Sequence, residues 1–174
     1  FFAGSLAQAA PVPDFLVTHS NGMRGRTRHY MLFGKRERLI RRILIVEDEP
    51  LVAFDNEHML QDEGYEIVAT VDNLADAVEA IGREPIDLVL TDISLAGEGD
   101  GIDVARAAQT KGVPVLFVTG HCTEDGRALA LGCLAKPYSD KVLKNALDVL
   151  ERHLQGKTPR KLPAQLTLFV EARA

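Results

Sequence analysis

Residues 88–95 read Leu-Val-Leu-Thr-Asp-Ile-Ser-Leu, an apolar run that stops at a single carboxylate, Asp92. A glycine-rich turn follows at 96–99. This pattern predicts a buried strand with Asp92 at its C-terminal end, which is where open parallel sheets bind ligands. A lone aspartate at a strand end more commonly caps the next helix. Other strand-like runs of the chain also end in polar residues, and they favour a shared site.

Apolar runs and amphipathic stretches alternate on both sides of this strand. We expect strands at 43–46, 65–71, 86–92, 113–119 and 133–135, and helices at 50–64, 73–82, 100–111, 124–131 and 138–154. Strands that are apolar along nearly their whole length indicate a parallel sheet covered on both faces. With right-handed crossovers, the simplest fold is α/β: a doubly wound, flavodoxin-like sheet of five parallel strands in the order 2-1-3-4-5.

The composition divides the chain into three parts. Residues 1–40 show no sustained hydrophobic period and are interrupted by proline and glycine, which predicts a weakly structured leader. Residues 41–155 carry the alternating pattern and form the expected domain, and 174 residues suffice for one core of ordinary size. We expect 156–174 to be a C-terminal tail, although 162–170 alternates weakly.

The charge is distributed unevenly. The net charge of −5 combines +6 in residues 1–42 with −11 in the remainder. A basic leader can contact nucleic acid or an anionic surface. A solvated arm is the commoner fate of such a segment, and both interpretations stay open.

The cysteine content and the lengths of the apolar runs bear on the compartment. Cys122 and Cys133 form neither a metal-binding spacing nor a disulfide framework, so we expect small packing residues in a reducing, cytoplasmic environment. No apolar run approaches the length that spans a bilayer, so we expect no membrane contact.

Polar residues follow four of the expected strands. In a 2-1-3-4-5 sheet, the first, third, fourth and fifth strands are neighbours, so Glu47, Asp48, Asp92, Thr119 and Lys136 face one cleft. Three carboxylates in one pocket raise one another's pKa unless a cation is present. A hard divalent ion, Mg²⁺, resolves this repulsion. A carboxylate nucleophile, a metal, a lysine and a hydroxyl are the groups that accept a phosphoryl group.

With these residues the chain resembles the receiver domain of two-component response regulators. The resemblance covers about residues 42–154 and rests on Ile43-Leu44-Ile45-Val46-Glu47-Asp48, Leu90-Thr91-Asp92, Asp100-Gly101, Phe117-Val118-Thr119-Gly120 and Lys136-Pro137. It implies that Asp92 is phosphorylated by a sensor histidine kinase or a histidine phosphotransfer protein. It also implies that Asp48 ligates Mg²⁺ directly and Glu47 through water, with Asp92 and the Ser94 carbonyl in the same shell.

The resemblance implies further roles. Thr119 and Lys136 would contact the phosphoryl oxygens, and the Lys136-Pro137 bond would be cis. Such a domain is a phosphoacceptor that supports its own phosphorylation and dephosphorylation, without being an enzyme on other substrates. Its output surface would combine the fourth helix, the fifth strand and the last helix, with a homodimer through the last helix as an alternative.

The sequence departs from the family pattern at several positions. Cys133 stands where an aromatic residue is usual, three residues before Lys136. The interval from Thr119 to Lys136 is short, which indicates a truncated fourth helix. Phe117-Val118-Thr119-Gly120 is similar to the Phe-Ala-Thr-Gly subgroup of single-domain regulators, but Cys122 replaces the aromatic expected after Gly120, so this match is partial.

The expected function is therefore a stand-alone receiver that signals or shuttles phosphate through protein contacts. Only 20 residues follow Leu154, too few for a DNA-binding output domain. An interaction module with a vestigial pocket, independent of phosphorylation, is the main alternative. A phosphatase of the haloacid-dehalogenase type needs an Asp-x-Asp motif, which Glu47-Asp48-Glu49 does not supply.

Overall fold

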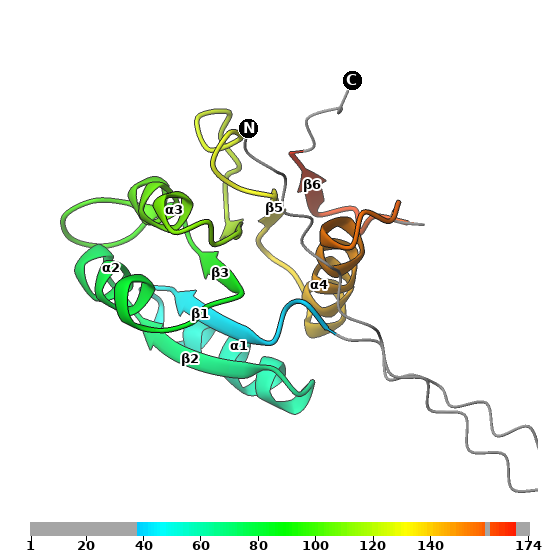
Figure 1. Ribbon diagram of the computed structural model, residues 1–174, viewed down its shortest axis with the longest axis horizontal. Coiled ribbons are helices and arrows are strands. Elements are labelled where there is room, and N and C mark those ends of the chain that lie inside the picture. The colour runs from blue at the N-terminus through cyan, green and yellow to red at the C-terminus, as the bar shows by residue number, and fades with distance from the viewer. Residues whose placement is uncertain (1–37, 159–160, 170–174) are drawn as a thin grey trace, which may run out of the picture. The chain divides into compact units, whose positions relative to one another are not determined.

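A computed structural model describes residues 38–158 and 161–169. They form a six-stranded sheet in the order β2-β1-β3-β4-β5-β6 (Figure 1). The strands are β1 (Arg42–Val46), β2 (Glu66–Val71), β3 (Leu88–Thr91), β4 (Val115–Thr119), β5 (Gly132–Ala135) and β6 (Leu166–Leu168). The helices are α1 (Pro50–Asp62), α2 (Leu74–Arg83), α3 (Gly101–Thr110) and α4 (Asp140–Leu154). Strands β1 to β5 pair in parallel, which confirms the predicted fold and the order 2-1-3-4-5.

The apolar strands are explained by two cores, one on each face of the sheet. Successive side chains of a strand point to opposite faces. Ile43 and Ile45 of β1 therefore join the core beneath α1 and α4, while Leu44 and Val46 join the core beneath α2 and α3. Figure 1 shows these two pairs of helices on opposite sides of the sheet. Because both faces of the sheet are buried, its strands are apolar at nearly every position instead of alternating between apolar and polar residues.

Three helices begin where the sequence supplies a start signal. Pro50 opens α1, where its missing N–H would have no intrahelical partner. The side chain of Asn73 accepts the N–H of Asp76 at 2.9 Å, as expected for the cap of α2. The side chain of Asp100 accepts the N–H of Asp103 at 3.0 Å and caps α3.

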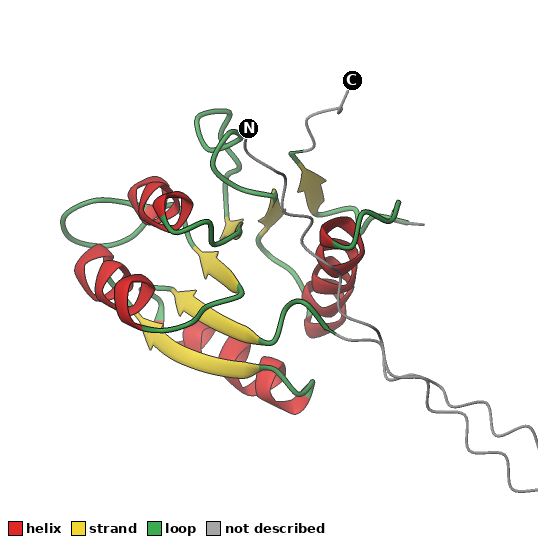
Figure 2. Cartoon of the chain, in the orientation of Figure 1, coloured by secondary structure: helices red, strands yellow, loops and turns green. Residues whose placement is uncertain are grey.

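The helix that we expected at 124–131 is absent, and this segment forms turns (Figure 2). Its backbone hydrogen bonds include Arg127 N–H to the carbonyl of Glu124 and Leu129 N–H to the carbonyl of Gly126, which span three residues. Gly126 lies against the ring of Phe117, so that a Cβ there would come within 2.5 Å of the ring. The close contact holds the segment against β4 as a series of turns, and the helix expected at 124–131 does not form.

The expectation of a simple tail after residue 156 is wrong for residues 166–168. They form β6, which pairs antiparallel with β5. Leu166 is buried in the core beneath α4. Backbone bonds from Ala135 N–H to the carbonyl of Gln165, at 3.0 Å, and from Phe169 N–H to the carbonyl of Leu131, at 2.9 Å, hold its ends. The strand β5 is therefore covered on its outer side.

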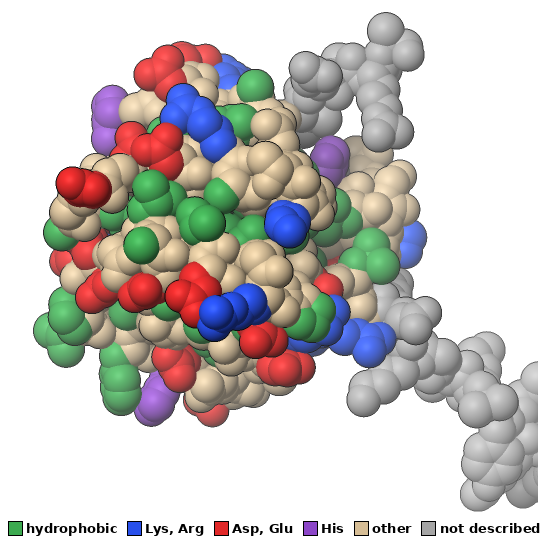
Figure 3. Space-filling view, turned by 60° about the vertical axis from the view of Figure 1, so that its left-hand side comes forward, with side chains coloured by type: hydrophobic (Ala, Val, Ile, Leu, Met, Phe, Trp, Pro, Cys, Tyr) green, Lys and Arg blue, Asp and Glu red, His purple; other side chains and the backbone are tan. Residues whose placement is uncertain are grey.

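The predicted leader, residues 1–40, lies outside the described residues except for 38–40. Of these, Ile40 is buried and packs into the core beneath α1 and α4. None of the described helices is long and apolar enough to cross a membrane. Acidic side chains are spread over the face of the domain shown in Figure 3, among hydrophobic and basic ones, and residues 43–174 together carry negative charge.

Candidate functional site

The ends of three strands bring an ion cluster together. Glu47 follows β1, Asp92 follows β3 and Lys136 follows β5. The Lys136 Nζ lies 2.7 Å from Glu47 Oε2 and 2.7 Å from Asp92 Oδ2. The side chains are 2%, 8% and 16% exposed for Glu47, Asp92 and Lys136. The sequence predicted that these three residues meet, and the structure places them in direct contact.

Both carboxylate oxygens of Asp92 have partners. Oδ2 accepts from Lys136, and Oδ1 accepts the N–H of Ser94 at 3.0 Å. The following loop is anchored by the N–H of Gly101, which donates to the carbonyl of Ile93 at 2.9 Å. The α-carbon of Gly101 also faces the backbone carbonyl of Asp92 so closely that a Cβ has no space. The carboxylate of Asp92 is therefore held in one orientation by the backbone around it.

The buried charges shift the pKa values of their partners. Burial raises the pKa of Glu47 above its ordinary value, and the hydrogen bond and charge of Lys136 offset this only in part. Burial alone would lower the pKa of Lys136, but its hydrogen bonds with Asp92 and Glu47 outweigh burial and raise it. One ammonium therefore does not fully compensate the carboxylates, and a further cation would stabilise their charged forms.

The donor atoms at this edge suit such a cation. Carboxylate oxygens of Glu47, Glu49 and Asp92 lie within 4.8 Å of one another. Oxygen ligands are those that Mg²⁺ prefers, and it commonly uses only a few of them from the protein. The residues present therefore fit a magnesium ion. Glu49 was missing from the predicted ligands, although the acidic run at 47–49 could have indicated it. Its side chain is 66% exposed, and its Oε1 lies 3.7 Å from Lys136 Nζ.

Asp48 and Ser94 lie beside this cluster. The Asp48 Oδ2 accepts the N–H of Ala96 at 3.0 Å, which links the loop after β1 to the loop after β3. Ser94 is exposed and contributes its N–H to Asp92. Asp48 is not part of the group of carboxylate oxygens formed by Glu47, Glu49 and Asp92, and metal binding by Asp48 and by the Ser94 carbonyl stays a prediction.

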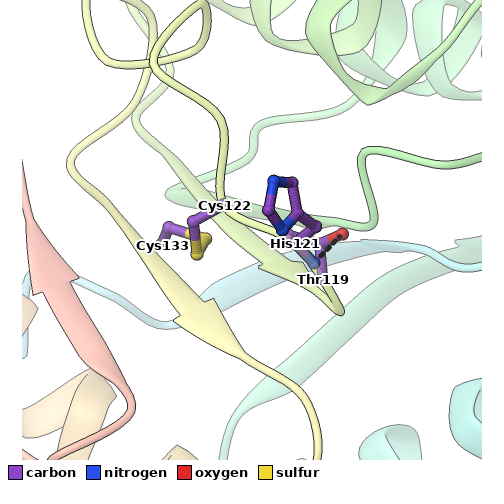
Figure 4. The surroundings of a disulfide bond; sticks show 4 residues. All are labelled: Thr119, His121, Cys122 and Cys133. Carbon is purple, nitrogen blue, oxygen red and sulfur yellow. Dashed lines mark hydrogen bonds between the residues drawn. A yellow bond between two sulfur atoms is a disulfide. The ribbon is translucent and has the colours of Figure 1, made fainter.

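Thr119 is the last residue of β4, which lies between β3 and β5 in the sheet. It therefore stands between Asp92, which follows β3, and Lys136, which follows β5. Its side chain is buried, and its Oγ1 accepts the N–H of His121 over a long 3.5 Å (Figure 4). Its carbonyl accepts the N–H of Lys136 at 2.8 Å, so the backbone of Thr119 positions the first residue after β5. The next bond, Lys136-Pro137, is cis as predicted.

The two cysteines are joined, which contradicts the expectation of separate packing residues. Cys122, in the loop after β4, forms a disulfide with Cys133 of β5, and their Cα atoms are 6.0 Å apart (Figure 4). Cys133 pairs with Phe117 in the β4–β5 ladder, so the loop after Thr119 must turn back along the sheet to reach it. Neither cysteine is free, and the argument from free thiols to a reducing compartment no longer applies.

The expected output surface also differs from the prediction. No helix covers residues 124–131, and β6 pairs with the outer side of β5. The last helix, α4, borders a groove of about 720 Å³ whose other wall is the segment 161–165. A surface made from the fourth helix, the fifth strand and the last helix is therefore not present in the form that the resemblance implied.

Comparison with known proteins agrees with this geometry. The family model of the response regulator receiver domain matches residues 43–148. The chain belongs to this family. It is 36% identical over 115 residues to the transcriptional regulatory protein PdtaR of Mycobacterium tuberculosis, which covers 63% of this chain and 56% of that protein. The chain thus spans little more than half the length of this relative.

Solved receiver domains show the same likeness. The N-terminal domain of a response regulator/sensory box/GGDEF three-domain protein from Carboxydothermus hydrogenoformans is 31% identical, with a TM-score of 0.61, covering 67% of this chain and 98% of that one. The receiver domain of the sensor histidine kinase PA1611 from Pseudomonas aeruginosa is 27% identical, with a TM-score of 0.55, covering 63% and 95%. In that structure a magnesium ion is coordinated in the active-site cleft.

Proposed function

We propose that this chain is a phosphorylatable receiver in which Asp92 accepts a phosphoryl group from a histidine kinase or a histidine phosphotransfer protein. The observation that carries the proposal is the contact of Lys136 Nζ with Asp92 Oδ2 at 2.7 Å inside a buried acidic pocket. A carboxylate oxygen attacks phosphorus, the bond from phosphorus to the donor nitrogen breaks, and an acyl phosphate forms on Asp92. Catalysis of such a transfer consists of positioning and of neutralising charge on the phosphoryl oxygens.

Each neighbour of Asp92 has a part in this step. The Ser94 N–H orients the carboxylate through Oδ1. The ammonium group of Lys136 already contacts Glu47 and Asp92, and it would shift to contact the incoming phosphoryl oxygens. Thr119 would donate its hydroxyl proton to the same group, and its Oγ1 can still accept the N–H of His121, because a hydroxyl both donates and accepts. Bound Mg²⁺ would add positive charge opposite the phosphoryl oxygens.

We assign the metal ligands as Asp48, Asp92 and the Ser94 carbonyl, with Glu47 acting through water. Asp48 is half-buried at the rim, whereas Glu49 is exposed and loses more side-chain freedom when it is fixed. The assignment makes a matched test between two adjacent carboxylates. Asp48→Asn should weaken Mg²⁺ binding, measured by isothermal titration, far more than Glu49→Gln. The reverse order would move the assignment to Glu49.

The output of the proposed receiver is protein binding, with the phosphoryl group as a signal or as cargo. This part of the proposal rests on the family. A cytoplasmic location and a homodimer through α4 belong to the same proposal. The altered output side, with Cys133 bonded to Cys122, favours one alternative: an interaction module that binds its partner independently of phosphorylation.

The test is the intact mass of the protein after incubation with acetyl phosphate and Mg²⁺. We expect the wild type to gain one phosphoryl group and Asp92→Asn to gain none. Asp87→Asn is the matched control, because Asp87 lies at the opposite end of β3 and should leave phosphorylation intact. If the wild type gained no mass from acetyl phosphate or from phosphorylated donor proteins, the interaction module would be the better assignment.

A further inference from the structure

We propose that the Cys122–Cys133 disulfide is reversible and that its redox state controls how readily Asp92 accepts a phosphoryl group. The proposal rests on the proposed function, because it concerns the same site. It adds a second input, the thiol–disulfide balance of the surroundings.

The disulfide lies close in the chain to two residues of the site, Thr119 and Lys136. Cys122 is three residues after Thr119, and Cys133 is three residues before Lys136. His121, whose N–H contacts the Thr119 hydroxyl, is bonded directly to Cys122 in the chain (Figure 4). The bridge thus ties the loop that holds this hydroxyl to the strand that carries the site lysine.

The loop contains no helix or strand, and turns occupy 125–129. Its second half is held by contacts that do not need the bridge, such as that of Gly126 with the ring of Phe117 and that of Arg127 with the ring of Phe169. Near Thr119, the bridge adds a covalent tie from Cys122 to β5. When the bridge is open, this tie is lost, so that residues 119–122 can adjust to a phosphoryl group at lower cost. Reduction should therefore favour the arrangement in which Thr119 reaches the phosphoryl group.

The different exposure of the two cysteines determines which of them reacts first with an external disulfide. Cys133 is fully buried, whereas Cys122 is half-buried. Oxidation begins when the Cys122 thiolate attacks a low-molecular-weight disulfide, which releases one thiol and leaves a mixed disulfide on Cys122. The Cys133 thiolate then attacks the Cys122 sulfur and releases the second thiol, and each cysteine gives up one proton. Reduction by two thiols reverses both steps, so electrons and atoms balance.

No other cysteine can confuse the effect. The chain contains two cysteines in all, so reductants and disulfide oxidants have one target. The wild type can therefore be compared with itself in two redox states without any substitution. The matched variant is Cys122→Ser, which removes the half-buried partner and leaves the buried position of Cys133 filled.

The experiment measures the rate of phosphorylation by acetyl phosphate and Mg²⁺, using the full chain equilibrated with reduced or oxidised glutathione. Thiol labelling with intact-mass detection first establishes whether both cysteines are free or bonded. We expect the reduced protein to be phosphorylated about fivefold faster or more, the lower end of typical coupling between two sites. We expect Cys122→Ser to match the reduced wild type in both buffers.

The outcomes separate the two proposals. Equal rates in both redox states, or two free thiols under oxidised glutathione, would overturn the redox proposal and leave the receiver function standing. A redox response that persists in Cys122→Ser would also overturn it. Absence of phosphorylation in every form, including Cys122→Ser, with acetyl phosphate and with phosphorylated donor proteins, would overturn the receiver function and the redox proposal together.

Discussion

The strand ends around Asp92 and the outer edge of the sheet at β5 are held by different forces. Around Asp92, the ammonium of Lys136 lies 2.7 Å from the buried carboxylates of Asp92 and Glu47, and the backbone N–H of Ser94 orients the Asp92 carboxylate. At the outer edge, a disulfide, the short strand β6 and a packed turn take the places of a helix. The meeting of Glu47, Asp92 and Lys136 in the first region agrees with the prediction from the sequence, whereas the structure of the second region differs from its prediction.

Under the proposed function, this difference follows from the task of each region. Phosphoryl transfer depends on a small number of groups at fixed separations, and displacing any of them by about 1 Å is costly. An output side only has to change shape when the site changes charge, and many structures can do that. Thr119 belongs to both regions, since its hydroxyl serves the site and its loop carries Cys122. The predictions below test whether the two regions respond separately.

The largest effect should come from Lys136→Met. The site loses the ammonium that contacts Asp92 and Glu47, so phosphorylation by acetyl phosphate should slow by about 10²–10³, the usual effect of removing one group that stabilises transition-state charge. Mg²⁺ affinity should rise, because a competing positive charge has gone. The opposite signs distinguish lost chemistry from lost folding. Lys144→Met, which removes a partly exposed partner of Glu63, is the control and should change neither quantity.

Gly101→Ala should have the next largest effect. A Cβ at this position would collide with the backbone carbonyl of Asp92, and neither element can move away without shifting the site. We expect a loss of about 2–3 kcal/mol in the free energy of unfolding, at the upper end for overpacking, together with slower phosphorylation. Urea unfolding and the acetyl phosphate assay measure the two effects. Retained stability and retained phosphorylation in Gly101→Ala would show that the loop after Asp92 tolerates displacement.

The strand ends could be predicted from sequence because their signals are local. Short apolar runs such as 43–46 and 88–90, bounded by polar residues, are typical of buried strands, and the polar residues that follow each run mark its carboxyl end. Once the order 2-1-3-4-5 is chosen, Glu47, Asp92 and Lys136 must meet at one edge. Glu49 was missed because its place in the cluster depends on how the chain turns into α1.

The outer edge could not be predicted because its signals are not local. The Cys122–Cys133 bond depends on the register of β4 with β5 and on a loop that turns back, neither of which the spacing of 11 residues encodes. The strand β6 has three residues, too few for a period to stand out. The prediction of a helix at 124–131 was wrong because Gly126 packs closely against Phe117 instead of taking part in a helical turn.

Gly132→Ala tests the outer edge alone and should have a smaller effect. A Cβ at Gly132 would lie 2.5 Å from the carbonyl oxygen of Thr167, so β6 must shift or detach. We expect a loss of about 1–2 kcal/mol and faster hydrogen exchange in 166–168, while phosphorylation stays close to the wild-type rate. Gly120→Ala is the control, since nothing lies within 4 Å of its added Cβ. A loss of phosphorylation in Gly132→Ala alone would show that the two regions are coupled through β5.

The smallest effect should come from Asp87, which holds the opposite end of β1 by charge but takes part in no reaction. Burial raises its pKa, but hydrogen bonds from the backbone and side chain of Arg42 and from the backbone of Arg41 outweigh burial, so its pKa is lowered below the ordinary 3.8. Its contribution is therefore present above pH 3.8 and is lost as the pH falls through the lower folded-state pKa. We expect Asp87→Asn to cost about 1 kcal/mol at pH 7, by urea unfolding, and the gap from the wild type to close in strong acid. If the difference in unfolding free energy between the wild type and Asp87→Asn did not change with pH, the shape of Asp87, rather than its charge, would anchor β1. Stabilisation by charge would then be confined to the end of the sheet that carries Asp92.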